Sequence, residues 1–182
     1  MNIDKAIKEA SFNLKKKQIK SALLDCEILM SKVLNKSREY IILNPNKEIN
    51  DYEYKSFKEL IFSRIKSKPI AYMIGEKSFW KYVFKINEKV LIPRPDTEIL
   101  IEQVLKIYKK KEGINFLEIG IGSGCIILSI LKEKKSFLGK GVDVSSDSLK
   151  VCKRNANKLG LVNRLKLFKS DIDNFLIGKY DL

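Results

Sequence analysis

Residues 116–124 place a short apolar run, an acidic residue and three alternate glycines next to one another. The run 116–119 predicts a buried strand. The glycines at 120, 122 and 124 let the backbone turn sharply and approach a ligand closely, because no Cβ stands in the way. The apolar stretch 125–131 predicts a helix whose first amides face the same ligand. Strand, glycine loop and helix together indicate a site for a nucleotide-type cofactor.

From residue 114 onward, strand and helix patterns alternate. Strands are predicted at 114–119, 137–144 and 165–168, a first helix at about 123–132, and a second helix that ends at Gly160. This β-α-β-α-β order predicts an α/β fold that begins a doubly wound parallel sheet. The last residues, 179–182, predict the opening of a fourth strand.

The first seventy-odd residues predict a small helical bundle. Apolar side chains recur at spacings of three and four in two successive stretches, 6–14 and 22–33. Asn50 followed by Glu53 predicts the N-terminus of a further helix, which Pro69 ends. No catalytic constellation lies in this part, so it is either a packing module or a substrate-docking domain.

Between these two regions the apolar period changes to two. Residues 79–86 and 90–92 predict the strands of a hairpin, with 87–89 as its turn. The prolines in Pro93-Arg94-Pro95 stop the strand, and Asp96 or Thr97 can cap the helix that follows.

The composition of the chain limits which ligands and partners it can be expected to bind. The net charge is +14, but the excess is dispersed: 24 basic against 15 acidic residues in 1–113, and 12 against 7 in 114–182. Only five basic residues are arginine, which is preferred for phosphate and base contacts, so we predict no direct nucleic-acid binding. Because the chain has no histidine, a histidine base or metal ligand is excluded, and we predict no metal site. Three dispersed cysteines, no membrane span and no secretory signal predict a cytoplasmic protein.

Two acids decide which cofactor the glycine loop suits. Asp143 ends the second strand, 19 residues after Gly124, where a carboxylate can accept both ribose hydroxyls of either a dinucleotide or S-adenosyl-L-methionine. Cys125 stands where a dinucleotide motif has its third glycine, and Glu118 suits a cationic sulfonium and ammonium but repels a pyrophosphate. Asp171, with Ile172 beside it, either meets the adenine amino group or caps the next turn. The predicted cofactor-binding residues are Glu118, Gly120, Ile121, Gly122, Ser123, Gly124, Asp143, Asp171 and Ile172.

The chain resembles the HemK-type protein-(glutamine-N5) methyltransferases that modify peptide chain release factors. The motifs that carry the resemblance lie at 69–75, 79–86, 118–124 and 141–145, and above all at 90–98, where Asp96 stands in place of the commoner glutamate. The resemblance implies methyl transfer from S-adenosyl-L-methionine to a glutamine side-chain amide of a release factor, in translation termination. It also implies a motif that closes over the site, formed by Pro93, Arg94, Asp96, Thr97 and Glu98.

The resemblance further implies a helical substrate-docking domain at 1–75, a β-hairpin linker at 76–95 and the first half of a class I (Rossmann-like) methyltransferase domain at 96–182. The family's catalytic motif, Asn-Pro-Pro-Tyr, does not occur in these 182 residues, so we predict no catalytic residue here. Asn155, Asn157 and Asn163 are expected on or near a surface helix and do not replace it. We therefore expect part of a longer or split enzyme that is poorly stable alone, with an unpaired apolar edge on strand 114–119, and the activity of the chain by itself stays open.

Two other classes of function stay open at this point. One is an amino-methyltransferase acting on nucleic-acid adenine, which uses a similar catalytic motif and which the basic charge favours. The other is a non-catalytic remnant that still docks a release factor through its helical domain.

Overall fold

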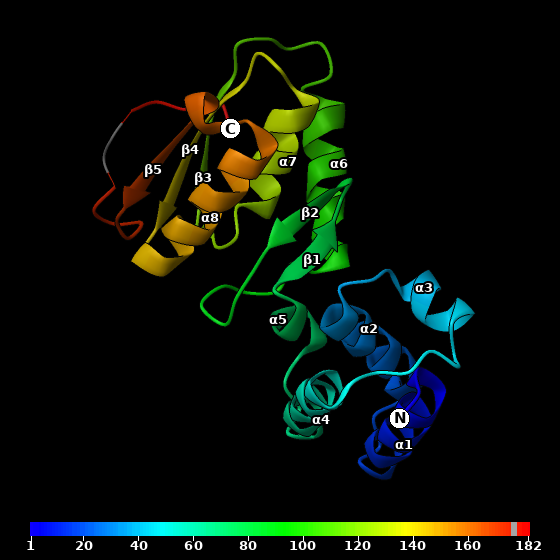
Figure 1. Cartoon of the computed structure of the whole chain (residues 1–182). Coiled ribbons are helices and arrows are strands. Elements are labelled where there is room, and N and C mark those ends of the chain that lie inside the picture. Colours follow the sequence, from blue (N-terminus) through cyan, green and yellow to red (C-terminus); the bar gives the residue numbers. More distant parts are fainter. Residues whose placement is uncertain (176–177) are drawn as a thin grey trace. The chain divides into compact units, whose positions relative to one another are not determined.

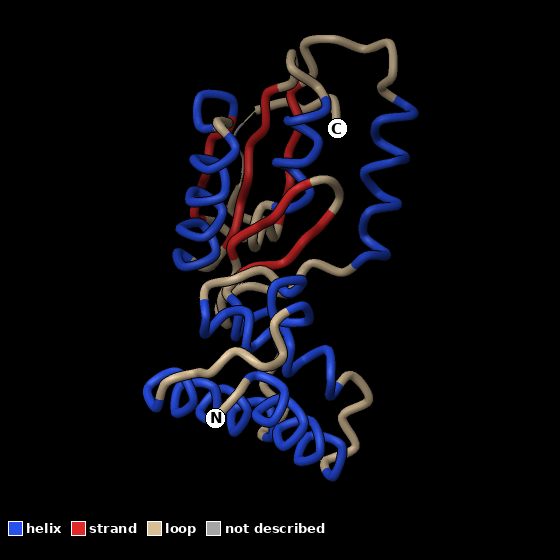
Figure 2. Tube along the Cα trace, turned by 45° about the vertical axis from the view of Figure 1, so that its right-hand side comes forward, coloured by secondary structure: helices blue, strands red, loops and turns tan. Residues whose placement is uncertain are grey.

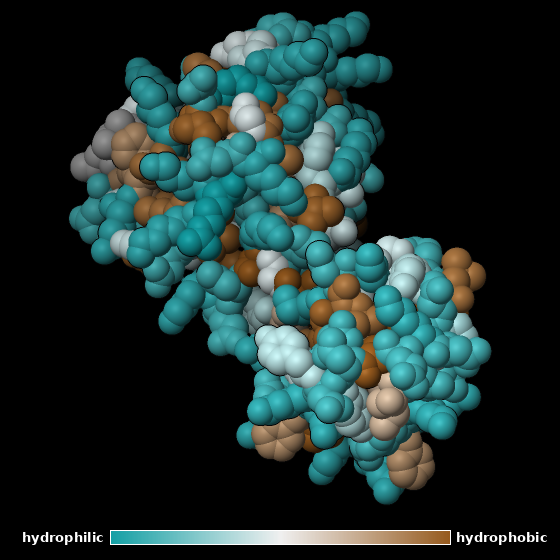
Figure 3. Space-filling model, in the orientation of Figure 1, coloured by the Kyte–Doolittle hydropathy of each residue, from teal (hydrophilic) through white to brown (hydrophobic). Residues whose placement is uncertain are grey.

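The computed structural model describes residues 1–175 and 178–182 and divides the chain into two compact units, Met1–Ile74 and Gly75–Leu182 (Figure 1). The first unit contains helices alone, whereas every strand among the described residues lies in the second (Figure 2). Over the same residues, no helix has both the length and the apolar character that crossing a membrane requires. Hydrophilic side chains cover most of the visible face of each unit, and smaller apolar patches are exposed on each of them (Figure 3).

The first unit is a helical bundle around one apolar core, as predicted. Its helices are α1 Ile3–Lys16, α2 Ala22–Leu34, α3 Arg38–Leu43, α4 Asp51–Ile65 and α5 Ile70–Ile74. The predicted faces are buried at Ala6, Ala10 and Leu14 of α1 and at Cys26 and Leu29 of α2. The prediction that Pro69 ends the preceding helix is wrong. α4 stops at Ile65, Ser67 takes a left-handed φ of 65°, and Pro69 instead precedes α5.

Local and long-range polar contacts fix α4. Asn50 Oδ1 accepts the Glu53 N–H at 2.8 Å, and Glu53 Oε2 accepts the Asn50 N–H at 2.9 Å, so the predicted cap is a reciprocal capping box. Further along, Arg64 pairs with the buried Asp25 of α2 at 2.7 Å. Losing either partner would leave a charge enclosed without compensation, so this pair holds α4 against α2 in one arrangement.

The second unit combines a hairpin with a parallel sheet. In chain order its elements are β1 Glu76–Phe79, β2 Tyr82–Lys85, the 3-10 turn Pro95–Thr97, α6 Glu98–Ile107, β3 Asn115–Ile119, α7 Cys125–Glu133, β4 Leu138–Asp143, α8 Ser146–Leu159, the 3-10 turn Val162–Arg164 and β5 Leu165–Lys169. The three later strands pair in parallel in the order β3-β4-β5. The predicted alternation of strands and helices is therefore confirmed, and the fold is α/β.

One layer of helices covers the sheet. Helices α7 and α8 contact each other and both contact β4, while α6 packs against α7 (Figure 1). The core between them is apolar and includes Phe116, Phe137, Ile127 and Leu128. Gly160 ends α8 in the left-handed conformation, as predicted.

The hairpin does not form where the sequence predicted it. Its strands are β1 and β2, and the loop is Trp80-Lys81, because Phe79 pairs directly with Tyr82. Trp80 takes a φ of 54°, which a two-residue loop requires but which tryptophan seldom adopts. The Glu98 carboxylate accepts the Trp80 N–H at 2.7 Å, and Glu133 accepts the indole N–H at 2.9 Å. These tertiary contacts place the turn, whereas residues 87–92 form no strand.

Two further local predictions are also corrected. Thr97 occupies the position before α6, but its side chain makes no capping bond there, because the 3-10 turn that begins at Pro95 leads directly into the helix. The edge of β3 is not wholly unpaired either. The Asp181 N–H donates to Asn115 O at 2.8 Å, and the Leu117 N–H donates to Leu182 O at 2.9 Å. Residues 181–182 therefore run beside the start of β3, although they form no regular strand.

Candidate functional site

The glycine loop joins the end of β3 to the start of α7. Gly120 and Gly122 take φ values of 74° and 52°, in the left-handed region. A Cβ built on Gly120 would meet no atom within 4 Å, and one on Gly122 would meet only the Gly120 oxygen at 4.0 Å. These two glycines are therefore set by backbone conformation and face open space that a ligand can enter.

At Gly124, close packing against α8 leaves no space for a side chain. Its φ is 77°, but a Cβ there would lie 2.5 Å from Cys152 Sγ and 3.0 Å from Leu128 Cδ1. The residue lets α8 approach the loop closely, so its absent side chain serves packing rather than access to a ligand.

The loop amides are mostly committed to bonds within the protein. The N–H groups of Gly120 and Ile121 both donate to Val142 O, at 2.8 and 3.1 Å. The Gly124 N–H donates to Ile121 O at 2.8 Å, and the Gly122 N–H donates to Asp143 Oδ2 at 3.0 Å. A phosphate site needs several such amides to point at the anion, so this loop is poorly suited to a pyrophosphate.

Glu118 lies at the base of the site and also begins the next helix. Its Oε2 accepts the Ile127 N–H of α7 at 2.9 Å. Burial raises the pKa of Glu118 to about 8, the Ile127 hydrogen bond opposes that rise, and the nearby Asp143 adds to it. The carboxyl group is therefore largely protonated at neutral pH and would ionise readily if a cation came close.

Asp143 ends β4 with both carboxylate oxygens engaged. Oδ2 accepts the Gly122 N–H, and Oδ1 accepts the Ser145 N–H at 2.8 Å. Its exposed fraction is only 9%. Each oxygen still has a second lone pair, so the carboxylate can orient the loop and accept ligand hydroxyls together.

A pocket of about 200 Å³ brings the loop together with the segment that follows the hairpin. Of the predicted site residues, it is lined by Pro93, Arg94, Thr97, Glu118, Gly120, Ile121, Gly122 and Ser123. Its wall also includes four residues that the sequence reasoning did not name, which are Leu91, Ile92, Cys125 and Ile126. An apolar hollow of about 340 Å³ shares Glu118, Gly120 and Ile126 with it, so most of the neighbours of the carboxyl group are apolar.

The remaining predicted residues lie outside that pocket. The Glu98 carboxylate binds the hairpin loop, and Asp96 is not among the lining residues. Asp171 accepts the N–H and side-chain amide of Asn174 at 2.8 Å, and these hydrogen bonds lower its pKa. This contact matches the turn-capping alternative for Asp171, while Ile172 beside it is exposed.

Asn155 was misjudged from the sequence. It was expected on a surface helix, but its exposed fraction is 1%, and it bonds to both the glycine loop and β2. The signal that could have revealed it is helical spacing, because Asn155 follows the buried Cys152 by three residues.

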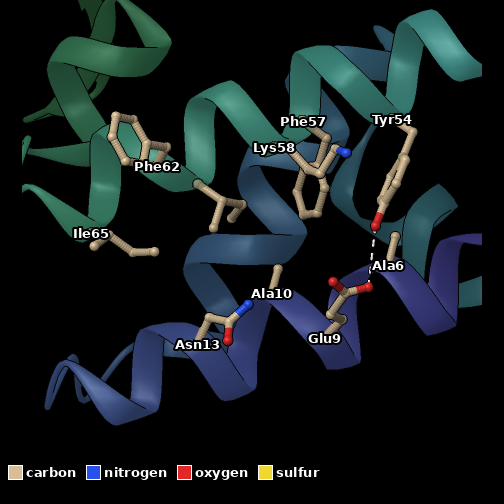
Figure 4. A pocket seen from close by; sticks show the side chains of 10 residues that line it. Ala6, Glu9, Ala10, Asn13, Tyr54, Phe57, Lys58, Phe62 and Ile65 are labelled. Carbon is tan, nitrogen blue, oxygen red and sulfur yellow. Dashed lines mark hydrogen bonds between the residues drawn. The ribbon is translucent and has the colours of Figure 1, made fainter.

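The helical unit has a groove of its own, between α1 and α4 (Figure 4). Its volume is about 210 Å³, and its apolar lining comes from Ala6, Ala10, Phe57, Ile61, Phe62 and Ile65. At one end the Tyr54 hydroxyl donates to Glu9 at 3.1 Å. The Lys66 ammonium lies 4.3 Å from the centre of the exposed Phe62 ring.

Known proteins resemble this chain both in its helical part and over most of its length. Residues 5–75 match the model of the PrmC N-terminal domain. The chain is 39% identical, over 91% of its length, to 59% of a release factor glutamine methyltransferase from Leptospira interrogans, and 34% identical, over its whole length, to 37% of a bifunctional methyltransferase from Rickettsia bellii. It thus spans less than two thirds of these curated relatives. An RNA methyltransferase from Salinibacter ruber, solved with S-adenosyl-L-homocysteine, overlaps 46% of this chain and 52% of that one at 19% identity and a TM-score of 0.40.

Proposed function

We propose that the chain forms the cofactor-binding part of a release factor glutamine methyltransferase, because residues 5–75 match the PrmC N-terminal domain and most of the chain is similar to such enzymes. The ligand is S-adenosyl-L-methionine, and the acceptor is a glutamine side-chain amide of a peptide chain release factor. The observation that carries this proposal is the pocket in which Glu118 and the open glycines face the segment 91–94.

The residues of the pocket suit that cofactor better than a dinucleotide. Most loop amides are already bonded within the protein, which leaves few donors for a pyrophosphate. Glu118 offers a carboxyl group that a nearby cation would ionise and attract, whereas a phosphate would keep it protonated and gain no charge pairing from it. When bound, S-adenosyl-L-methionine supplies a methyl group on a cationic sulfur.

Each part of the site then has its own task. Gly120 and Gly122 leave space for the ligand, and Asp143 accepts its ribose hydroxyls while holding the Gly122 amide. Pro93, Arg94 and Thr97 cover the pocket from the opposite wall and exclude water. We assign no residue of this chain to activation of the glutamine amide, which requires orientation of its lone pair rather than a strong base.

The helical unit is the docking surface for the release factor in this proposal. Its groove between α1 and α4 has an apolar lining that combines the small Ala6 and Ala10 with larger side chains, among them the exposed Phe62 (Figure 4). Such a hollow accepts an apolar side chain of a protein partner.

Calorimetry with S-adenosyl-L-homocysteine tests the cofactor site. We expect the Asp143→Ala variant to lose more than tenfold in affinity, because the carboxylate both accepts hydroxyls and orients the loop. Asp147→Asn, an exposed acid on α8, is the matched control and should bind like the unchanged chain. Equal affinity in all three proteins would contradict the role of Asp143.

Methyl transfer tests the acceptor. Because the chain holds no Asn-Pro-Pro-Tyr motif, it is fused to the C-terminal part of the Leptospira interrogans relative that it does not cover. The fusion is incubated with labelled S-adenosyl-L-methionine and, in separate reactions, with release factor or with DNA and RNA. Label on a release factor glutamine would support the proposal. Label on nucleic-acid adenine would favour the amino-methyltransferase alternative, and binding of release factor by a chain that does not bind S-adenosyl-L-homocysteine would favour the docking remnant.

A further inference from the structure

Asn155 is a buried polar side chain with a complete set of partners. It lies on α8 with an exposed fraction of 1%. Its Oδ1 accepts the Lys85 N–H at 2.7 Å, and its Nδ2 donates to Lys85 O and to Ser123 O, both at 2.9 Å. Both amide hydrogens are used, so removing the side chain would leave three backbone groups without a partner.

Those three bonds join two segments that are distant in sequence. Lys85 is the last residue of β2, 70 positions before Asn155, and Ser123 lies in the glycine loop, 32 positions before it. Ser123 is itself buried. Its carbonyl stands between the Gly122 amide, which binds Asp143, and Gly124, which precedes the first residue of α7.

A second residue on the same face of α8, Cys152, also contacts the glycine loop. Cys152 lies one turn before Asn155, and its sulfur occupies the space next to Gly124. Packing from Cys152 fixes how close the loop comes to α8, whereas the Asn155 hydrogen bond fixes which way the Ser123 peptide points. Packing alone is not directional, so the amide supplies the orientation.

We propose that Asn155 is a positioning residue, which orients the loop 120–124 for ligand binding and couples that loop to the end of β2. The functional part of this inference rests on the proposed cofactor site, but the coupling between loop and hairpin does not. Only an amide serves both ends here, because aspartate could accept from Lys85 but could not donate to either carbonyl.

The test compares Asn155→Asp with Asn157→Asp in the full chain. Asn157 lies two residues away on the exposed side of α8, so the control makes the same chemical change without touching the loop. Hydrogen exchange is measured for the amides of 120–124, of Lys85 and of β4. Affinity for S-adenosyl-L-homocysteine is measured by calorimetry on the same proteins.

In Asn155→Asp we expect the Gly122 and Gly124 amides to exchange about tenfold faster while β4 keeps its protection, and we expect a loss of about tenfold in affinity. The Lys85 amide should stay protected, since aspartate still accepts it. A role in global stability alone would instead raise exchange in β4 as much as in the loop, and that result would overturn the proposal. So would a loop that exchanges equally in the two variants.

The test remains decisive if the variant fails to fold or if the chain does not bind S-adenosyl-L-homocysteine. If Asn155→Asp does not fold, as judged by the fluorescence of Trp80, Asn155→Ser takes its place, because a hydroxyl retains one donor. If the unchanged chain does not bind S-adenosyl-L-homocysteine, the proposed cofactor is wrong, and the exchange comparison alone still decides whether Asn155 orients the loop.

Discussion

Glu118 should make the stability of the second unit depend on pH in a range where few other groups titrate. Burial raises its pKa from the usual 4.5 to about 8 in the folded chain. An acid whose pKa is raised by folding stabilises the native state fully below pH 4.5, and that contribution is lost as the pH rises toward 8. The chain has no histidine, and burial raises the pKa of Cys125 to about 11, so neither residue type titrates between pH 6 and 7.5 in the fold.

The magnitude follows from proton counting. Between pH 6 and 7.5 the folded chain keeps one proton that the unfolded chain has released, so the free energy of unfolding falls by about 1.4 kcal/mol per pH unit, or about 2 kcal/mol over the interval. This is an upper figure, because Glu118 is only partly buried and solvent screens part of the effect.

Urea unfolding followed by the fluorescence of Trp80 measures this change. Trp80 is the chain's single tryptophan and belongs to the second unit, so its signal reports that unit. In Glu118→Gln the pH dependence should disappear, because glutamine keeps an acceptor for the Ile127 N–H but binds no proton. Glu102→Gln, an exposed acid on α6, is the control and should keep it. An equal slope in the unchanged chain and in Glu118→Gln would refute the assignment.

Two further predictions concern the docking groove and the loop. Phe62→Ala should weaken binding to a release factor about tenfold in a titration by interferometry. Tyr52→Ala removes another exposed aromatic ring of α4 that lies outside the groove, and it should leave the affinity unchanged. Equal losses of affinity in the two variants would contradict the assignment of the groove. Gly124→Ala should cost about 3 kcal/mol in the free energy of unfolding and Gly120→Ala only about 1 kcal/mol, because both are strained but only the former collides with Cys152. Urea unfolding monitored at Trp80 compares the two glycine variants, and equal costs would argue against the packing role of Gly124.

The elements predicted correctly are those whose signals are local. Asn50 and Glu53 form a capping box within one helical turn, so four consecutive residues suffice to predict it. The parallel strands follow from apolar runs between amphipathic helices, and Gly160 ends α8 for a backbone reason that holds in any context. These features need no information from distant parts of the chain.

The predicted position of the hairpin was wrong, because the turn that forms depends on residues distant in sequence. Trp80 carries no turn signal, and its left-handed conformation depends on Glu98 and Glu133, which lie 18 and 53 residues further along. Asn87-Glu88-Lys89 has the composition of a turn, and the Asn87 side chain does accept the Lys89 N–H, yet no second strand follows it. Local composition therefore indicated a turn correctly but assigned it to the wrong element.

The sequence predicted only those residues of the candidate site that are close to one another in the chain. Glu118 and the glycines follow one another in sequence, so a single motif predicted them together. Asn155 joins the site only through the fold, since it reaches the loop from 32 residues away. Its neighbours Cys152 and Ala156 are buried, which an apolar pattern predicts, but an asparagine among them carries no apolar signal.

Glu118 links ligand binding to the junction between β3 and α7. The same carboxyl group that faces the pocket accepts the Ile127 N–H of α7, so its charge state affects both the helix start and the ligand. A cation in the pocket favours the ionised form, and binding of S-adenosyl-L-methionine must then release the proton that the empty site holds. The affinity for the ligand should therefore rise with pH over the interval in which the free energy of unfolding falls. These opposite trends would come from one residue, and both should vanish together in Glu118→Gln.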